Sequence, residues 1–244
     1  MRRVFLNHPE SAQNLGKVFD ATILAMASLA EPGEAGNHLL RTQHYVRALA
    51  RKLQASPAYA DLLSEEYIAA LFQAAPLHDI GNAGIPDRIL LKPGALTNDE
   101  LDIIKTHPVI GRNTIDQIRQ SAGVEMAFLD LAREIVYSHQ ERWDGSGYPQ
   151  GIAGDRIPVA ARLMAIADAY DALTNRRVYR EGVPHDVAVQ QIFAQRAAHF
   201  DPDMVDAFIE IQDEFLTIAQ QYADSEGDLQ KKIEYMATAI AESP

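Results

Sequence analysis

Apolar residues along the chain recur mostly at helical spacing, whereas the strict alternation typical of a half-buried strand is scarce. Residues 37–53 show this most clearly, because Leu39, Val46, Leu49 and Leu53 fall on one stripe. The same spacing predicts helices over residues 15–30, 64–78, 99–106, 108–120, 126–140, 158–175, 202–222 and 227–241. The pattern therefore predicts an all-α fold.

Local signals mark where these helices begin and end. Thr97 starts a capping-box pattern, and the Asp201-Pro202 pair combines an N-cap with a proline in the first turn. Pro76 is expected to kink the helix that precedes the His-Asp dipeptide at 78–79. Residues 81–94 and 141–157 are rich in glycine and proline, so they are predicted to be loops.

Composition narrows the chemistry that this fold can carry. The 244 residues include no cysteine, so disulfides, thiolate metal sites and cysteine nucleophiles are excluded. A formal net charge of −12 argues against a DNA-binding protein, although a small anion could still bind at a local positive site. The sequence has no apolar run long enough for a membrane span and no secretory start, so we expect a cytoplasmic protein without membrane association.

Histidines and carboxylates cluster at helix ends and on apolar helix faces. These residues are His38, His78, Asp79, His107, His139 and Asp168. Without thiolates, a divalent metal takes imidazole and carboxylate ligands, and two ions about 3.5–4 Å apart can share a bridging carboxylate such as Asp79. The alternative is that each histidine is a buried residue satisfied by hydrogen bonds. The other histidines, His8, His44, His185 and His199, are expected to be surface or capping residues.

Five motifs in consistent order make the sequence similar to a known family. They are HDIGNAGIP at 78–86, ILLKPG at 89–94, KTH at 105–107, SHQERWDGSGYP at 138–149 and IADAYDALT at 166–174. Together they resemble the HD-GYP domain, a branch of the HD phosphohydrolases. The resemblance implies an HD-type helical bundle with a metal centre in its interior and an irregular GYP loop.

The resemblance also implies roles for individual residues. It assigns metal binding to Glu34, His38, His78, Asp79, His107, His139 and Asp168. The centre would hold two divalent ions, iron or manganese first, with zinc, nickel or magnesium as alternatives. Arg177 and Arg180 would contact phosphate or guanine, while Gly147 and Tyr148 of the GYP loop would shape the substrate pocket.

The activity implied is metal-dependent hydrolysis of cyclic di-GMP to pGpG or GMP, in which a hydroxide bridging the ions attacks phosphorus. Asp79 and the Asn82 position would be catalytic. Asn82 departs from the family, which has lysine there, and Gln140 stands where histidine is frequent. The alternative function is therefore a weakly active or inactive cyclic di-GMP receptor, or an adaptor that binds GGDEF-type or other signalling proteins through the GYP loop.

The resemblance divides the chain into three parts. Residues 1–32 are similar to the helical linker of response regulators, residues 33–215 form the HD-GYP domain, and residues 216–244 are a helical extension. The terminal helices are expected to pack on the bundle, or else to form a homodimer interface.

Overall fold

The computed structural model describes residues 9–31, 36–123, 126–175 and 182–242, and these residues form helices without any named strand. The α-helices are α1 (Pro9–Ala30), α2 (Gly36–Gln54), α3 (Glu65–Ala74), α4 (Asp87–Leu90), α5 (Asn98–Ile104), α6 (His107–Ala122), α7 (Ala127–Ser138), α8 (Val159–Thr174), α9 (His185–Ala194), α10 (Pro202–Glu210), α11 (Gln212–Gln221) and α12 (Glu226–Glu242). Short 3₁₀ helices are η1 (Ala75–Leu77), η2 (Ile80–Gly84) and η3 (Gly154–Arg156). The all-α prediction is confirmed.

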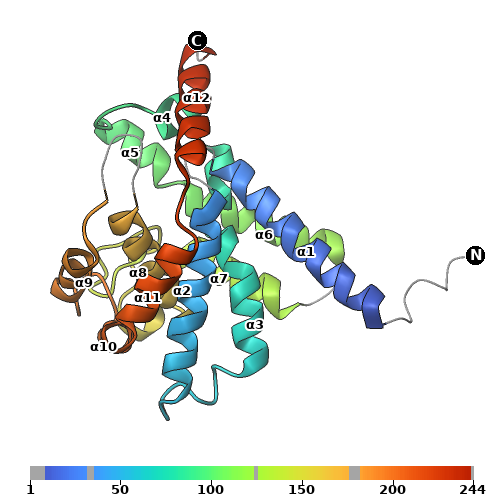
Figure 1. Cartoon of the computed structure of the whole chain (residues 1–244), viewed down its shortest axis with the longest axis vertical. Helices are drawn as coiled ribbons and strands as arrows, with labels where there is room; N and C mark the ends of the chain where they lie inside the picture. Colours follow the sequence, from blue (N-terminus) through green and yellow to red (C-terminus); the bar gives the residue numbers. More distant parts are fainter. Residues whose placement is uncertain (1–8, 32–35, 124–125, 176–181, 243–244) are drawn as a thin grey trace, which may run out of the picture.

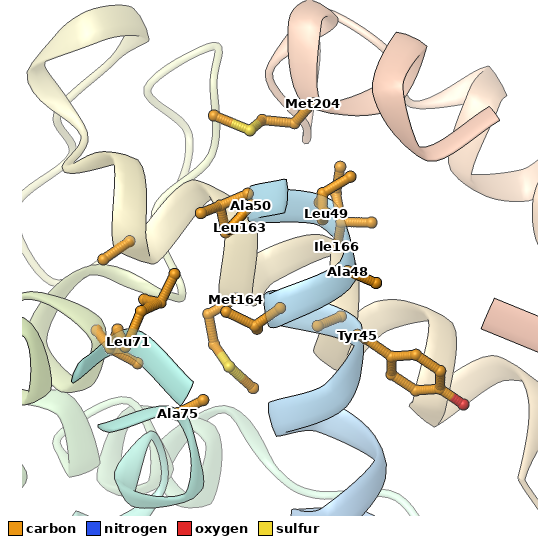
Figure 2. Packing of buried hydrophobic residues seen from close by; sticks show 14 of the residues in the cluster. Tyr45, Ala48, Leu49, Ala50, Leu71, Ala75, Leu163, Met164, Ile166 and Met204 are labelled. Atoms are coloured by element: carbon orange, nitrogen blue, oxygen red, sulfur yellow. The ribbon is translucent and has the colours of Figure 1, made fainter. Parts of the chain in front are cut away.

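Helix α2 runs through the middle of the bundle and packs against α3, α8, α10 and α11 (Figure 1). Figure 2 shows its buried face, where Tyr45 and Leu49 lie among side chains of the neighbouring helices. The Tyr45 ring stacks on Phe215 of α11 at 4.5 Å and meets Tyr170 of α8 edge-on at 5.3 Å. Truncating a buried aromatic such as Phe215 to alanine would cost about 3–5 kcal/mol. This aromatic contact therefore fixes α8 and α11 on α2.

The helix predicted over residues 64–78 is interrupted where the kink at Pro76 was predicted, and its α-helical part is shorter than predicted. Ser64 caps α3 by accepting a hydrogen bond from the Tyr67 backbone, and the α-helix stops at Ala74. The chain then tightens into η1, with Pro76 in its first turn. Because η1 and η2 are short and tightly wound, His78 and Asp79 lie between them rather than along a regular helix. The loop predicted at 81–94 likewise contains η2 and α4.

The prediction of a single helix from 202 to 222 is wrong. The chain divides at Ile211, whose backbone N–H bonds to the Phe208 carbonyl in a tight turn between α10 and α11. This break lets Phe208 and Phe215 both enter the core, where their rings meet edge-on at 4.9 Å. Helix α9 has no counterpart in the helices predicted from apolar spacing.

Helix α1 packs on the body of the bundle with one face only. The ring of Phe19 meets Phe128 of α7 edge-on at 5.4 Å, and Ala27 is fully buried. The opposite face leaves Leu29 exposed, and the helix extends away from the bundle toward the N-terminus (Figure 1). Among the described residues, no helix combines the length and the apolar character needed to cross a bilayer.

Candidate metal centre

A close backbone approach sets the position of the His78-Asp79 turn. A methyl group on Gly81 would overlap the carbonyl oxygen of His107, and one on Gly111 would overlap the Val136 side chain. Only glycine permits this contact between η2 and the first turn of α6. The contact brings Asp79 next to His107, which lies 28 residues later in the sequence.

Three side chains from three different segments converge on one point. The Oδ1 atom of Asp79 lies 3.3 Å from Nε2 of His107 and 3.2 Å from Nε2 of His139. The three ligand atoms lie within 4.8 Å of one another, which would allow them to hold one metal ion. The imidazole of His139 is 5.4 Å from that of His107 and 5.5 Å from that of His78, so the rings form a continuous cluster.

The backbone orients the rings of His78, His107 and His139 in the same way. Nδ1 of each ring contacts a carbonyl oxygen in the preceding helical turn, namely that of Ala75 at 3.2 Å, Ile104 at 2.8 Å and Ile135 at 3.0 Å. A proton on Nδ1 donates this bond and leaves Nε2 as a lone-pair acceptor, the form in which histidine binds a metal.

The acceptor atoms of this cluster lack hydrogen-bond partners in the described part of the chain. They are Nε2 of His78, His107 and His139 and Oδ1 of Asp79, all buried. Buried polar atoms are normally paired, since leaving one unpaired costs about 1–3 kcal/mol. Four acceptors facing one another without a donor fit a cation, so the donor set present suits a divalent metal.

A second group adjoins the first through the His78-Asp79 dipeptide. Nε2 of His38 lies 3.4 Å from Oε2 of Glu31, and these two residues with His78 form another trio whose ligand atoms lie within 4.8 Å of one another. His78 Nε2 is 3.9 Å from Asp79 Oδ2, so the two groups are immediate neighbours. The geometry could therefore accommodate two ions side by side.

Asp171 orients His38, and the sequence analysis did not identify it. Its Oδ2 lies 2.7 Å from Nδ1 of His38, and the carboxylate also accepts two hydrogen bonds from Arg41, at 2.6 and 3.1 Å. Asn175 adds a bond of 2.9 Å to Oδ1. The signal that could have revealed this residue is its spacing, because Asp171 follows Asp168 by three positions on α8 and therefore shares its helix face.

The pKa values of the ionisable groups in this buried cluster are shifted from their usual values. Burial alone would raise the pKa of the Asp79 carboxyl, but the charge of His78 and contacts with His107 and His139 hold it well below the usual range. Burial lowers the pKa of His78. Burial also opposes a charge on His139, yet its contact with Asp79 raises the pKa of that imidazole. Asp79 is thus the negative centre around which the histidines are arranged.

Asn82 lies against Asp79 rather than free in the site. Its Nδ2 donates a 3.0 Å hydrogen bond to Asp79 Oδ2, and its backbone N–H bonds to the Asp79 carbonyl. The side chain is buried. Asn82 therefore fixes Oδ2 of Asp79 and leaves Oδ1 for other partners.

The GYP loop is irregular, as predicted, and closes over one side of the cluster. Tyr148 donates its backbone N–H to the Gln140 carbonyl, and its ring meets that of His107 at 6.2 Å. A methyl group on Gly147 would overlap the backbone of Glu141. Glu141 itself is buried and accepts a 2.7 Å hydrogen bond from the Gln150 backbone N–H. This glutamate ties the loop to the end of α7.

The other residues predicted for the site lie either outside the described part of the chain or beside the two trios. Glu34, Arg177 and Arg180 lie outside the described residues, and Glu31 is the glutamate found beside His38. Asp168 is half-buried, and its charge acts on His78, His139 and Tyr148, although it belongs to neither trio.

Two histidines expected at the surface or in caps have other roles. His44 is half-buried between Arg47 and Tyr222, and His199 is half-buried with its ring stacked on Phe200 at 4.1 Å. Tyr222 reaches His44 only through the fold, whereas Phe200 is the sequence neighbour of His199. His185 is the first residue of α9, directly after the N-cap Pro184, and its Nδ1 lies 2.8 Å from the Tyr170 hydroxyl. His8 lies outside the described residues.

Comparison with known proteins agrees with this geometry. The chain is 50% identical over 214 residues to a protein of Vibrio cholerae named "Probable cyclic di-GMP phosphodiesterase", covering 87% of this chain and 48% of that protein. It is 44% identical to a second V. cholerae protein, named "Cyclic di-GMP phosphodiesterase", covering 90% and 45%. The chain thus spans about half the length of these curated relatives.

A solved structure shares the fold. An HDG"Y"P protein from Bdellovibrio bacteriovorus superposes with a TM-score of 0.51 at 18% identity, over 86% of this chain and 67% of that one. The model of the HD domain family matches residues 26–204, which contain every residue of the cluster described above. The chain belongs to the HD domain family and contains an HD-GYP domain.

Proposed function

We propose that this chain binds two divalent metal ions at the cluster and hydrolyses cyclic di-GMP there. The observation that carries the proposal is the set of four buried acceptor atoms of His78, Asp79, His107 and His139 that face one another without donors. Asp79, His107 and His139 would hold one ion, and Glu31, His38 and His78 the other. Asp168 and Glu34 are further candidate ligands.

The ions would be iron or manganese, which the HD-GYP resemblance implies, and a donor set of imidazole and carboxylate without thiolate is compatible with both. Zinc, nickel or magnesium are the alternatives. Two adjacent trios favour two ions over three, since Gln140 supplies no imidazole where the family often has one. When bound, the ions would polarise the scissile phosphate and supply a strong nucleophile from water at neutral pH.

The residues of this chain would hold and orient the reacting groups. Asp79 would hold one ion and lies beside His78 of the other trio, and Asn82 would keep its carboxylate in place through the 3.0 Å hydrogen bond. Tyr148 and Gly147 would form one wall beside His107. Arg177 and Arg180 would neutralise the phosphates of the substrate, which carries two negative charges. The curated relatives named as cyclic di-GMP phosphodiesterases support this substrate.

A second candidate function rests on Asn82. Its amide already donates to Asp79 and carries no charge, so it would stabilise developing negative charge less than a lysine would. The domain would then act mainly as a receptor for cyclic di-GMP. It could signal by binding other proteins, GGDEF-type proteins included, through the GYP loop.

Metal analysis and a product assay separate these functions. Protein purified without chelator should contain about two ions per chain, whereas less than half an ion per chain would refute the metal centre. Asp79→Ala should lose the metal, and Asp102→Ala, which removes an exposed carboxylate of α5, should keep it.

The product assay uses metal-loaded protein with cyclic di-GMP and, in parallel, 3′3′-cGAMP. Appearance of pGpG or GMP from cyclic di-GMP supports the enzyme. Tight binding of cyclic di-GMP without any product supports the receptor.

A further inference from the structure

A polar cavity lies between α2 and α11, separate from the metal centre. Its volume is about 320 Å³, at the lower end of the roughly 300–1,000 Å³ found for small-molecule sites. The residues that line it are His44, Arg47, Ala48, Arg51, Glu214, Thr217, Ile218, Gln221 and Tyr222. None of these residues is part of the cluster described above.

Arg47 is held rigidly in this cavity with most of its donors unused. Its guanidinium lies over the Phe72 ring at 4.3 Å, and its Nη2 is 2.7 Å from Nδ1 of His44. Burial and the charge of Arg47 lower the pKa of His44 to about 4, so this imidazole is neutral at pH 7 and accepts the bond. A guanidinium has five N–H groups, and with the described residues Arg47 forms one hydrogen bond, the one to His44.

The same histidine also orients a second donor. With Nδ1 accepting from Arg47, Nε2 carries the proton and donates to the Tyr222 hydroxyl at 3.0 Å. Gln221 donates to that hydroxyl as well, at 3.2 Å. Because the Tyr222 oxygen accepts two bonds, its own proton is left to donate to a ligand.

The charge of the cavity is unbalanced. Arg47 and Arg51 lie one helical turn apart, and neither forms an ion pair with a described carboxylate, although the neighbouring Lys52 pairs with Glu210. Burial and then the charge of Arg51 lower the pKa of Arg47, against a smaller opposing effect of Tyr222 and Glu214. Glu214 is the carboxylate in the lining, and it is exposed.

We propose that this cavity binds a small phosphate-bearing molecule, with Arg47 and Arg51 contacting the phosphate and Tyr222 donating a hydrogen bond to it. Arginine binds phosphate oxygens through paired N–H groups, and Arg47, held by Phe72 and His44, supplies such a pair at low entropic cost, with the exposed Arg51 adding a second charge one helical turn away. The cavity is larger than inorganic phosphate requires, which favours an organic phosphate. Tyr222 also contacts Arg41 through its carbonyl, so the site borders the network that orients His38.

Calorimetric titration of the metal-loaded protein tests this site, with AMP as the organic phosphate. Adenosine is the uncharged control, and inorganic phosphate tests whether the anion alone suffices. Arg47→Gln and Arg51→Gln should each weaken AMP binding about tenfold or more. Lys52→Gln removes the same charge from the same helix outside the cavity and should leave binding unchanged.

The Asp79→Asn variant separates failure of this site from failure of the proposed function at the metal centre. AMP binding that survives Asp79→Asn lies outside the metal centre and does not depend on hydrolysis. AMP tighter than phosphate assigns the site to organic phosphates, and equal affinity assigns it to the inorganic ion. Three results would overturn the proposal. Adenosine could bind as tightly as AMP, Lys52→Gln could weaken AMP binding as much as the arginine variants do, or Arg51→Gln, a change at an exposed residue, could leave the affinity for AMP unchanged. Arg51→Gln keeps this test open even if Arg47→Gln loses stability with its Phe72 contact.

Discussion

Asp171→Asn is the substitution that most directly tests how this centre is built. The carboxylate contacts His38 at 2.7 Å and forms two hydrogen bonds with Arg41, whose side chain is 1% exposed. Asparagine has nearly the same shape, but one oxygen becomes an NH₂ group that cannot accept. The variant therefore removes the charge partner of a buried guanidinium and one acceptor for either His38 or Arg41.

The structure predicts two separable effects of this change. Removing one partner of a buried ion pair costs about 3–5 kcal/mol. The loss here should fall at the lower end, because Asp224 at 3.3 Å and the Tyr222 carbonyl at 2.8 Å still contact Arg41. Loss of the acceptor that orients a metal-binding histidine should weaken metal affinity by about 10–100-fold.

Urea unfolding measures the first effect, and competition with a chelator for bound manganese measures the second. Asp224→Asn is the matched control, since it removes a carboxylate from Arg41 without touching His38. Asp171→Asn should lower both stability and metal affinity, whereas Asp224→Asn should lower stability alone. If Asp171→Asn binds manganese as tightly as Asp224→Asn does, the assignment of Asp171 as the residue that orients His38 is refuted.

Three further predictions address the turn, the ions and the missing lysine. Gly81→Ala should lower stability by about 1–3 kcal/mol and reduce metal content, because its methyl group overlaps the His107 carbonyl; unfolding and metal analysis at wild-type values would contradict this. Chelator should destabilise the wild type by about 2.7 kcal/mol when metal had been present at 100 times its dissociation constant, and it should not affect Asp79→Ala, as thermal unfolding with and without chelator can show. Asn82→Lys should raise turnover of cyclic di-GMP at least about tenfold, measured as pGpG and GMP formed; an unchanged rate would exclude the missing lysine as the limiting feature.

The sequence predicted the parts of the fold that depend on interactions between residues close together in the chain. Apolar spacing identified α2, and Pro76 identified the irregularity after α3, because both depend on residues within one or two turns. The break at Ile211 was not predictable in this way. It depends on Phe208 and Phe215 both reaching a core formed by α2 and α8, which the sequence of α10 and α11 does not reveal.

The same limit applies to the candidate site. His78, His107 and His139 could be selected by residue type and position at helix ends, and the structure brings them together. Asp171 and Glu31 were missed because a carboxylate near a helix end has many ordinary explanations, and their closeness to His38 arises only when α1, α2 and α8 pack. His44 was misjudged for the same reason, since Tyr222 reaches it from 178 residues away.

The acidic character of the chain and its proposed anionic substrate are compatible because the two charges act over different distances. A net charge of −12 is spread over the whole surface and is screened beyond about 8 Å at physiological ionic strength. At the centre, Glu31, Asp79 and Asp168 would contribute −3 against +4 from two divalent ions, which leaves the site locally positive. The ions would therefore be required for binding of cyclic di-GMP as well as for its hydrolysis. Metal-free protein should lose affinity for the substrate, and it should not behave as a receptor that binds without turnover.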